Sequence, residues 1–143
     1  MFKQLPEKEF SFDIDIIGES TGQEYKGRFT AKATLSIGER VELERAISSF
    51  ISDFANPTDN LSNLAIMISN IRFHITKYPD WWDINTNGIE IEDLNLIAEI
   101  FSKIMKGKAD WSKKISKTAK KSINKDTEKS EEAKEVEKEG PLE

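Results

Sequence analysis

The sequence predicts an α+β fold: an N-terminal antiparallel β-hairpin packed on three α-helices, followed by a charged, largely disordered C-terminal tail. Two patterns predict the folded part. Apolar and polar residues alternate over residues 10–35, which is typical of strands with one buried face. Apolar residues then recur every three or four positions in three segments between residues 37 and 105, which is typical of amphipathic helices. A third observation, the scarcity of large apolar residues after residue 107, predicts that the tail does not fold on its own.

The hairpin is expected over residues 10–17 and 25–35. Turn-forming residues at 18–23 connect its strands through a loop longer than a tight two-residue turn. The polar faces of the two strands carry opposite charges, which favour an antiparallel register. The acidic residues are Asp13 and Asp15, and the basic residues are Lys26, Arg28 and Lys32.

The first two helices have recognisable beginnings. Ser36 followed by Glu39 forms the pattern of a capping box, and apolar spacing continues from there to about Phe54. The second helix is expected to begin with Asn56 as its cap and Pro57 in its first turn, and to continue to about Lys77. Because it carries the largest number of apolar residues, we expect this helix at the centre of the core.

Tyr78 and Pro79 end the second helix, and a loop with two tryptophans follows. Residues 89–91 are predicted to form a short extended piece. The third helix is expected from about Glu92 to Met105, and Gly107 is placed to terminate it.

Acidic and basic residues are unevenly distributed along the chain. The net charge is -5 over 143 residues, but residues 1–105 carry 10 basic and 17 acidic side chains, residues 106–125 carry 8 and 1, and residues 126–143 carry 3 and 8. We therefore predict a flexible N-terminus (1–9), an α+β domain (10–107), a basic, weakly amphipathic arm (108–125) and an acidic disordered tail (126–143).

The composition excludes several classes of protein. Without cysteine the chain has no disulfide, no thiolate nucleophile and no sulfur-bound zinc. Neither a nucleophile elbow nor a phosphate-binding glycine loop occurs, so we expect no enzyme and no cofactor. No segment has the apolar length of a membrane span or a secretory signal, which predicts a cytoplasmic protein with no membrane partner.

Two polar features resemble metal or acid–base sites. Asp83, Asn85 and Asn87, followed by a glycine, match the start of a calcium-binding EF-hand loop, but Leu94 stands where the final glutamate ligand is needed. Loop formation explains these residues without calcium. His74, the only histidine, lies on the apolar second helix and is expected to be partly buried in the core.

Candidate partner-binding residues lie in two places. The first is the Tyr78–Trp82 turn, where we expect at least one tryptophan to fold back onto the helices and the other to stay partly exposed. The second is the basic arm, where apolar residues recur every four positions among lysines and specific nucleic-acid binding is not expected. These candidates are Tyr78, Pro79, Trp81, Trp82, Trp111, Lys113, Lys114 and Lys117.

The order of elements resembles the tail assembly chaperones of long-tailed bacteriophages. The similar features are the hairpin text of residues 22–32, the Tyr78-Pro79-Asp80-Trp81-Trp82 turn, and the glycine-containing entry to the last helix at residues 88–94. The resemblance implies a non-enzymatic protein of the host cell cytoplasm that binds the tape measure protein and keeps it soluble during tail assembly.

Other functions stay open at the level of sequence. The chain could be a structural minor protein of the virion head, neck or tail, with another tail or virion protein as its partner. It could also be a calcium-dependent binding module built on Asp83–Gly88, and self-association is a further possibility.

Overall fold

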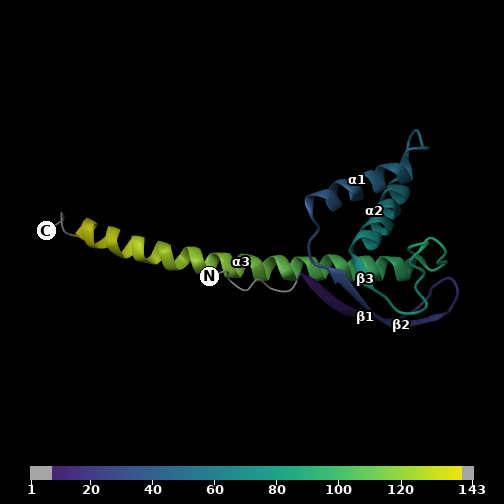
Figure 1. Cartoon of the computed structure of the whole chain (residues 1–143), viewed down its shortest axis with the longest axis horizontal. Helices are drawn as coiled ribbons and strands as arrows, with labels where there is room; N and C mark the ends of the chain where they lie inside the picture. Colours follow the sequence, from purple (N-terminus) through teal and green to yellow (C-terminus); the bar gives the residue numbers. More distant parts are fainter. Residues whose placement is uncertain (1–7, 140–143) are drawn as a thin grey trace. The chain divides into compact units, whose positions relative to one another are not determined.

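The computed structural model describes the backbone of residues 8–139 and the side chains of residues 8–118. Figure 1 shows the elements in this part of the chain, and they confirm the α+β class with an N-terminal hairpin and three helices. The elements are β1 (Glu9–Ile17), β2 (Glu24–Lys32), α1 (Ile37–Ile51), α2 (Asp59–His74), β3 (Ile75–Lys77) and α3 (Leu94–Glu139). Residues Glu7–Ala109 form one compact unit, which we call the body.

The hairpin is antiparallel, as predicted. Strands β1 and β2 pair antiparallel, with Asp13 opposite Arg28 and Asp15 opposite Lys26. The Arg28 guanidinium lies 3.6 Å from the Asp13 carboxylate on the exposed face. On the other face Ile14 is buried, because alternate residues of a strand point to opposite sides of the sheet.

A third strand, β3, replaces the last turn predicted for the second helix. α2 ends at His74, and β3 then pairs antiparallel with the free edge of β2, with Ile75 opposite Ala31. The sheet order is β1-β2-β3. The prediction of a helix to Lys77 was therefore wrong. The free backbone groups of β2 pair with this segment, and the local sequence gives no sign of that pairing.

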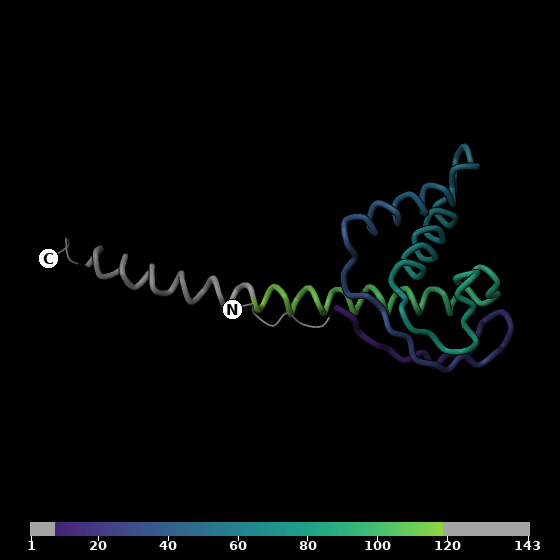
Figure 2. The backbone as a smooth tube through the Cα atoms, viewed as in Figure 1, coloured from purple at the N-terminus to yellow at the C-terminus, as the bar shows by residue number. Residues whose placement is uncertain are grey.

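The helix starts differ in how well the sequence predicted them. The capping box is confirmed, since the Glu39 amide donates to Ser36 Oγ and the Ser36 amide donates to Glu39 Oε1, both at 3.1 Å. α2 is capped by Thr58 rather than by Asn56, and it starts two residues after Pro57. Figure 2 shows how the chain turns from α1 into α2 through residues 52–58. α1 ends at Ile51, before the predicted Phe54.

α3 begins at Leu94 and continues through Gly107, so the prediction that Gly107 terminates it was wrong. A Cβ atom at Gly107 would lie 2.0 Å from the Phe10 ring. The glycine is therefore explained by the close packing of β1 against α3, which leaves no room for a side chain. Residues 89–91, predicted as extended, form turns and irregular backbone instead.

The core lies between the sheet, α2 and the first part of α3. Its most deeply buried large side chains include Phe29, Ile71, Leu96, Ile100 and Ile104. α3 thus contributes as much to the centre as α2, which was predicted to be the most buried helix. Ile66 of α2 is 38% exposed.

Two predictions lie partly outside the described residues. Of the flexible N-terminus predicted at 1–9, residues 1–7 are not described, and β1 already includes Glu9. The backbone of the tail predicted at 126–143 is helical as far as Glu139, as part of α3, and the side chains of this segment are not described.

Candidate binding groove

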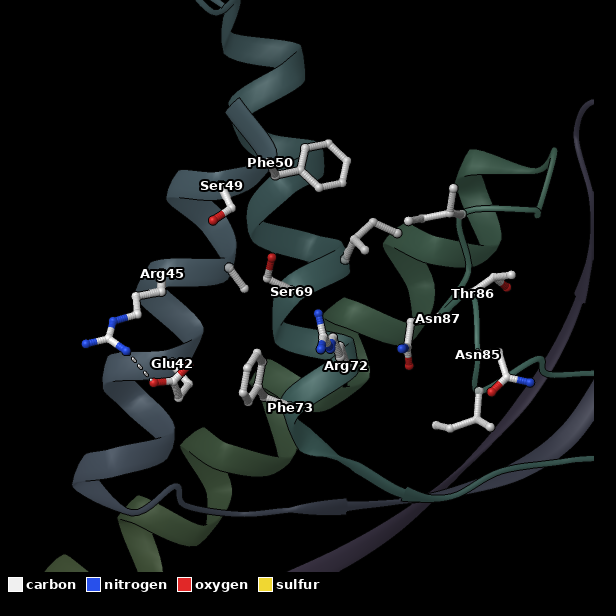
Figure 3. A pocket seen from close by; sticks show the side chains of 14 residues that line it. Glu42, Arg45, Ser49, Phe50, Ser69, Arg72, Phe73, Asn85, Thr86 and Asn87 are labelled. Carbon is white, nitrogen blue, oxygen red and sulfur yellow. Dashed lines mark hydrogen bonds and ion pairs between the residues drawn. The ribbon is translucent and has the colours of Figure 1, made fainter. Parts of the chain in front are cut away.

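A groove of about 860 Å³ lies between α1, α2 and the loop that precedes α3 (Figure 3). We call it the interhelix groove. Apolar and polar residues both line it from all three segments. The lining residues are Glu42, Arg45, Ala46, Ser49, Phe50, Ile68, Ser69, Arg72, Phe73, Ile84, Asn85, Thr86, Asn87 and Ile89.

The groove exists because α1 packs on the rest of the body along one side only. No residue of α1 is buried, although the helix carries an apolar stripe. Phe50 of α1 and Phe73 of α2 are half-buried and point into the space between the two helices (Figure 3). At the loop side, Ile84 is 39% exposed and Ile89 is 63% exposed. Exposed apolar side chains at the edge of a groove can contact another protein.

The charges of the groove are unequal. On α1, Arg45 donates to Glu42 at 2.9 Å, so these two charges compensate each other. On α2, the exposed Arg72 makes no ion pair with any described residue, and its guanidinium carbon lies 5.6 Å from the centre of the Phe73 ring. Asn87, which lines the same groove, has a buried Oδ1 without a hydrogen-bond donor among the described residues.

The double-tryptophan turn belongs mainly to the core. Trp82 is only 3% exposed, so we assign it to folding rather than to contact with a partner. Trp81 is half-buried, and its indole Nε1 donates to the Lys26 carbonyl at 2.8 Å. Pro79 lies against β2, where a Cβ atom at Gly27 would come within 2.6 Å of the proline ring.

The turn that carries the resemblance therefore has a structural explanation: Pro79 and Trp81 cover the strand at a glycine, and Trp82 fills the space beside Phe29. Of the four partner-binding candidates in this turn, only Tyr78 is largely exposed, at 41%. None of the four lines the interhelix groove.

Asp93, directly before α3, holds the hairpin loop. Its Oδ1 accepts from the amides of Ser20 and Thr21 at 2.8 and 2.9 Å, and its Oδ2 accepts from the hydroxyls of Thr21 and Tyr25 at 2.5 and 2.7 Å. The hydrogen bond from the Thr21 hydroxyl, followed by the one from Tyr25, lowers the pKa of Asp93 to about 2. The same bond to Asp93, together with burial, raises the pKa of Tyr25. This carboxylate is thus structural and is not free to act as an acid or base.

His74 is fully buried and both of its ring nitrogens are engaged. Nδ1 lies 2.7 Å from the Asn70 carbonyl and Nε2 lies 2.8 Å from Lys108 Nζ. The ammonium can only donate, so Nε2 accepts and the proton of the neutral ring resides on Nδ1. Burial lowers the pKa of His74, and the neighbouring Lys108 adds to this effect. The sequence predicted a partly buried histidine at the core, and the side chain is fully buried.

The Asp83–Gly88 segment folds as a turn. The Asn85 amide donates to Asp83 Oδ1 and the Asn87 amide donates to the Asp83 carbonyl, both at 2.9 Å. Gly88 has a φ of +92°, and a Cβ there would lie 2.8 Å from both Trp82 and Ile97. Loop geometry and packing therefore account for the residues that resemble a calcium loop. Within the described residues, no cluster of three or more His, Asp or Glu side chains could hold a metal ion.

The candidates of the basic arm lie on the later part of α3. Lys113, Lys114 and Lys117 are exposed, and Trp111 lies one helical turn before Ile115. The spacing therefore places the two apolar side chains on the same face of the helix, as the sequence predicts.

Sequence reasoning missed the interhelix groove. Its walls come from three separate segments, and the apolar residues of the two helices fit ordinary core stripes. The signal that could have indicated it is Arg72, a cation placed directly between Ile71 and Phe73 in the most apolar helix.

In the part of the chain that the structure describes, no helix combines the length and the apolar character needed to cross a bilayer. Comparisons with protein-family models, with curated proteins and with solved structures found no match to this chain.

Proposed function

We propose that this chain is a non-enzymatic assembly chaperone that binds an apolar helical segment of a partner protein in the interhelix groove. The observation that carries the proposal is the groove itself, which lies open between α1, α2 and the loop at residues 84–89 and is lined by apolar and polar residues together. Amphipathic helices bind other proteins by laying their apolar face into grooves of this kind.

The chemistry of the body supports binding over catalysis. The side chains with shifted pKa values hold the fold together: Asp93 and Tyr25 fix the hairpin loop, Glu39 caps α1, and His74 with Lys108 joins α2 to α3. None of them lines the interhelix groove. The groove therefore offers shape, apolar surface and charge, which are what a binding protein needs.

The partner we propose is the tape measure protein of a long-tailed phage, bound in the host cell cytoplasm during tail assembly. The resemblance of the hairpin and of the Tyr78–Trp82 turn to tail assembly chaperones supports this choice. A tape measure protein is long and aggregation-prone, and covering its apolar helices is the task for which a small acidic domain with an open apolar groove is suited.

The test is co-expression of the full chain with the tape measure protein of the same phage. We expect a soluble complex that co-purifies. Ser49→Trp places a large side chain in the groove from α1. We expect it to weaken the complex by about tenfold or more, because the indole occupies the space in which the partner's helix binds.

Ser48→Trp is the matched control, since Ser48 is an equally exposed neighbour on α1 that does not line the interhelix groove. Equal binding by the two variants would remove the groove from the proposal. Mass spectrometry of purified particles tests the transient role: a stoichiometric amount of this chain in the finished virion would identify a structural component instead of a chaperone.

A further inference from the structure

The lining of the interhelix groove is basic, although the body as a whole is acidic. Residues 1–105 have 17 acidic and 10 basic side chains, yet the lining of the groove has two arginines and one glutamate. The glutamate, Glu42, is already paired with Arg45. Arg72 is left as the uncompensated charge of the groove.

Arg72 is positioned to meet an occupant. It is exposed, it makes no ion pair among the described residues, and it lies at the boundary between the apolar lining around Phe73 and the polar loop (Figure 3). Its guanidinium stacks beside the Phe73 ring at 5.6 Å, an arrangement that leaves its N–H groups available. A guanidinium presents a planar set of donors that matches a carboxylate in a bidentate pair.

The loop side of the groove is polar. Asn87 Oδ1 is buried within the loop and has no donor among the described residues, so it is not a contact for an occupant. Asn85 and Arg72 line the groove and are exposed, so an occupant can reach them. Beside the apolar lining, these two polar side chains favour an occupant that is polar on one side and apolar on the other.

We propose that the interhelix groove selects partner helices that carry a carboxylate beside their apolar stripe, and that Arg72 is the residue that recognises this charge. The proposal rests on the proposed function and specifies the chemistry of the bound segment. The apolar stripe covers Phe50, Ile68 and Phe73, while the carboxylate pairs with the Arg72 guanidinium at the edge. Helices with a lysine at the same position are disfavoured by like-charge repulsion.

The experiment uses three fluorescein-labelled model helices of 18 residues with the same leucine stripe, which differ only in carrying Glu, Gln or Lys beside it. Fluorescence anisotropy with the full chain measures each affinity. We expect the Glu helix to bind about tenfold more tightly than the Lys helix, with the Gln helix in between. Arg72→Gln is expected to remove the preference, and Arg72→Glu is expected to reverse it.

Arg40→Glu is the matched control, because Arg40 is an exposed arginine of α1 outside the interhelix groove and the change in net charge is the same. We expect it to keep the wild-type order. Circular dichroism of each variant confirms that the fold is retained, since Arg72 is exposed and supports no ion pair among the described residues.

The possible failures are distinguishable. If the three helices bind equally and Ser49→Trp abolishes all binding, the groove is a binding site without charge selection, and only the role of Arg72 is overturned. The same holds if Arg72→Glu keeps the wild-type order. If no helix binds, or if Ser49→Trp affects none of them, the groove does not hold amphipathic helices and the proposed function fails with it.

Discussion

The phenol of Tyr25 donates to the carboxylate of Asp93 across 2.7 Å, and this bond joins β2 to the residue that precedes α3. The two residues are 68 positions apart in the sequence and both are buried. Asn95 adds two further bonds to the same hairpin, one from its Nδ2 to the Ile17 carbonyl at 3.0 Å and one accepted by its Oδ1 from the Glu19 amide at 3.1 Å. The residues at the start of α3 thus hold the loop between β1 and β2, a contact that the sequence does not indicate.

Asp93→Asn is expected to destabilise the body and release the hairpin loop. The amide nitrogen cannot accept the bonds that Oδ2 accepts from Thr21 and Tyr25, so both hydroxyls lose their partner, and that of Tyr25 is buried. We expect the midpoint of thermal unfolding to fall by about 5 °C or more, and amide exchange at Ser20 and Thr21 to become faster. Tyr25→Phe removes only one bond to Asp93, so an equal or larger effect of Tyr25→Phe would contradict this interpretation.

The acidic limb of the stability curve is expected to depend on Asp93 and Glu39. The pKa of Asp93 is lowered from 3.8 to about 2, and the pKa of Glu39 is lowered from 4.5 to about 2, chiefly by its bond with Lys32. The unfolded chain therefore takes up protons first, and the stability these carboxylates contribute is complete above pH 4.5 and lost as the pH falls towards 2. Urea unfolding between pH 5 and 2 measures this loss, which should be smaller in Asp93→Asn and in Glu39→Gln.

His74 is expected to titrate below its usual range. Burial lowers its pKa beneath 6.5, and the positive charge of Lys108 lowers it further. Because the chain has one histidine, the ring proton signals in an NMR titration belong to His74 alone. We expect a midpoint below 6.5 in the wild type. Lys108→Met should raise the midpoint without restoring it fully, since burial is the larger cause; a wild-type midpoint at or above 6.5 would contradict the buried neutral ring.

The same residue predicts how stability changes near neutral pH. The unfolded chain protonates His74 at about pH 6.5, whereas the folded chain protonates it only at lower pH. The free energy of unfolding should therefore be highest above pH 6.5 and decrease as the pH falls below that value. Denaturant unfolding at pH 7.5, 6.5 and 5.5 measures the change, and a flat profile would show that His74 does not contribute to it.

Gly107→Ala is expected to destabilise the body, against the usual behaviour of helices. In an exposed helix interior, alanine is more favourable than glycine by about 1 kcal/mol. Here the added Cβ would come within 2.0 Å of the Phe10 ring, so the ring or the strand that carries it must shift. Denaturant unfolding of Gly107→Ala, Phe10→Leu and the double variant forms a double-mutant cycle. The cost of the alanine should shrink in the Phe10→Leu background, and a more stable Gly107→Ala variant would disprove the packing explanation.

The two adjacent tryptophans are expected to respond differently to substitution. Trp82→Ala removes a large buried side chain and should cost about 3–5 kcal/mol of unfolding free energy. Trp81→Phe keeps an aromatic ring over Gly27 but loses the bond from Nε1 to the Lys26 carbonyl, for a cost of about 1 kcal/mol. Chemical denaturation compares them. Equal costs would contradict the different burial of the two side chains.

The sequence alone determined the features that depend on neighbouring residues. Alternation indicated which face of each hairpin strand is buried, because the side-chain period of a strand is two and a slip by one residue would expose Ile14. The Ser36–Glu39 capping box was readable because both of its hydrogen bonds form within four residues. The prediction that one tryptophan turns inward and one stays partly exposed is confirmed, although the sequence did not indicate which.

Only the tertiary structure decided the features that join distant segments. Residues 75–77 fit a helix or a strand equally well, and the free edge of β2 made them a strand. Glycine is typical of a helix end, but Gly107 lies inside α3. The Phe10 ring occupies the place where a side chain would stand. The interhelix groove also depends on the tertiary structure, because three segments form it. The fold places Arg72 beside apolar residues of this groove and gives it no ion-pair partner among the described residues, and neither fact can be predicted from the sequence.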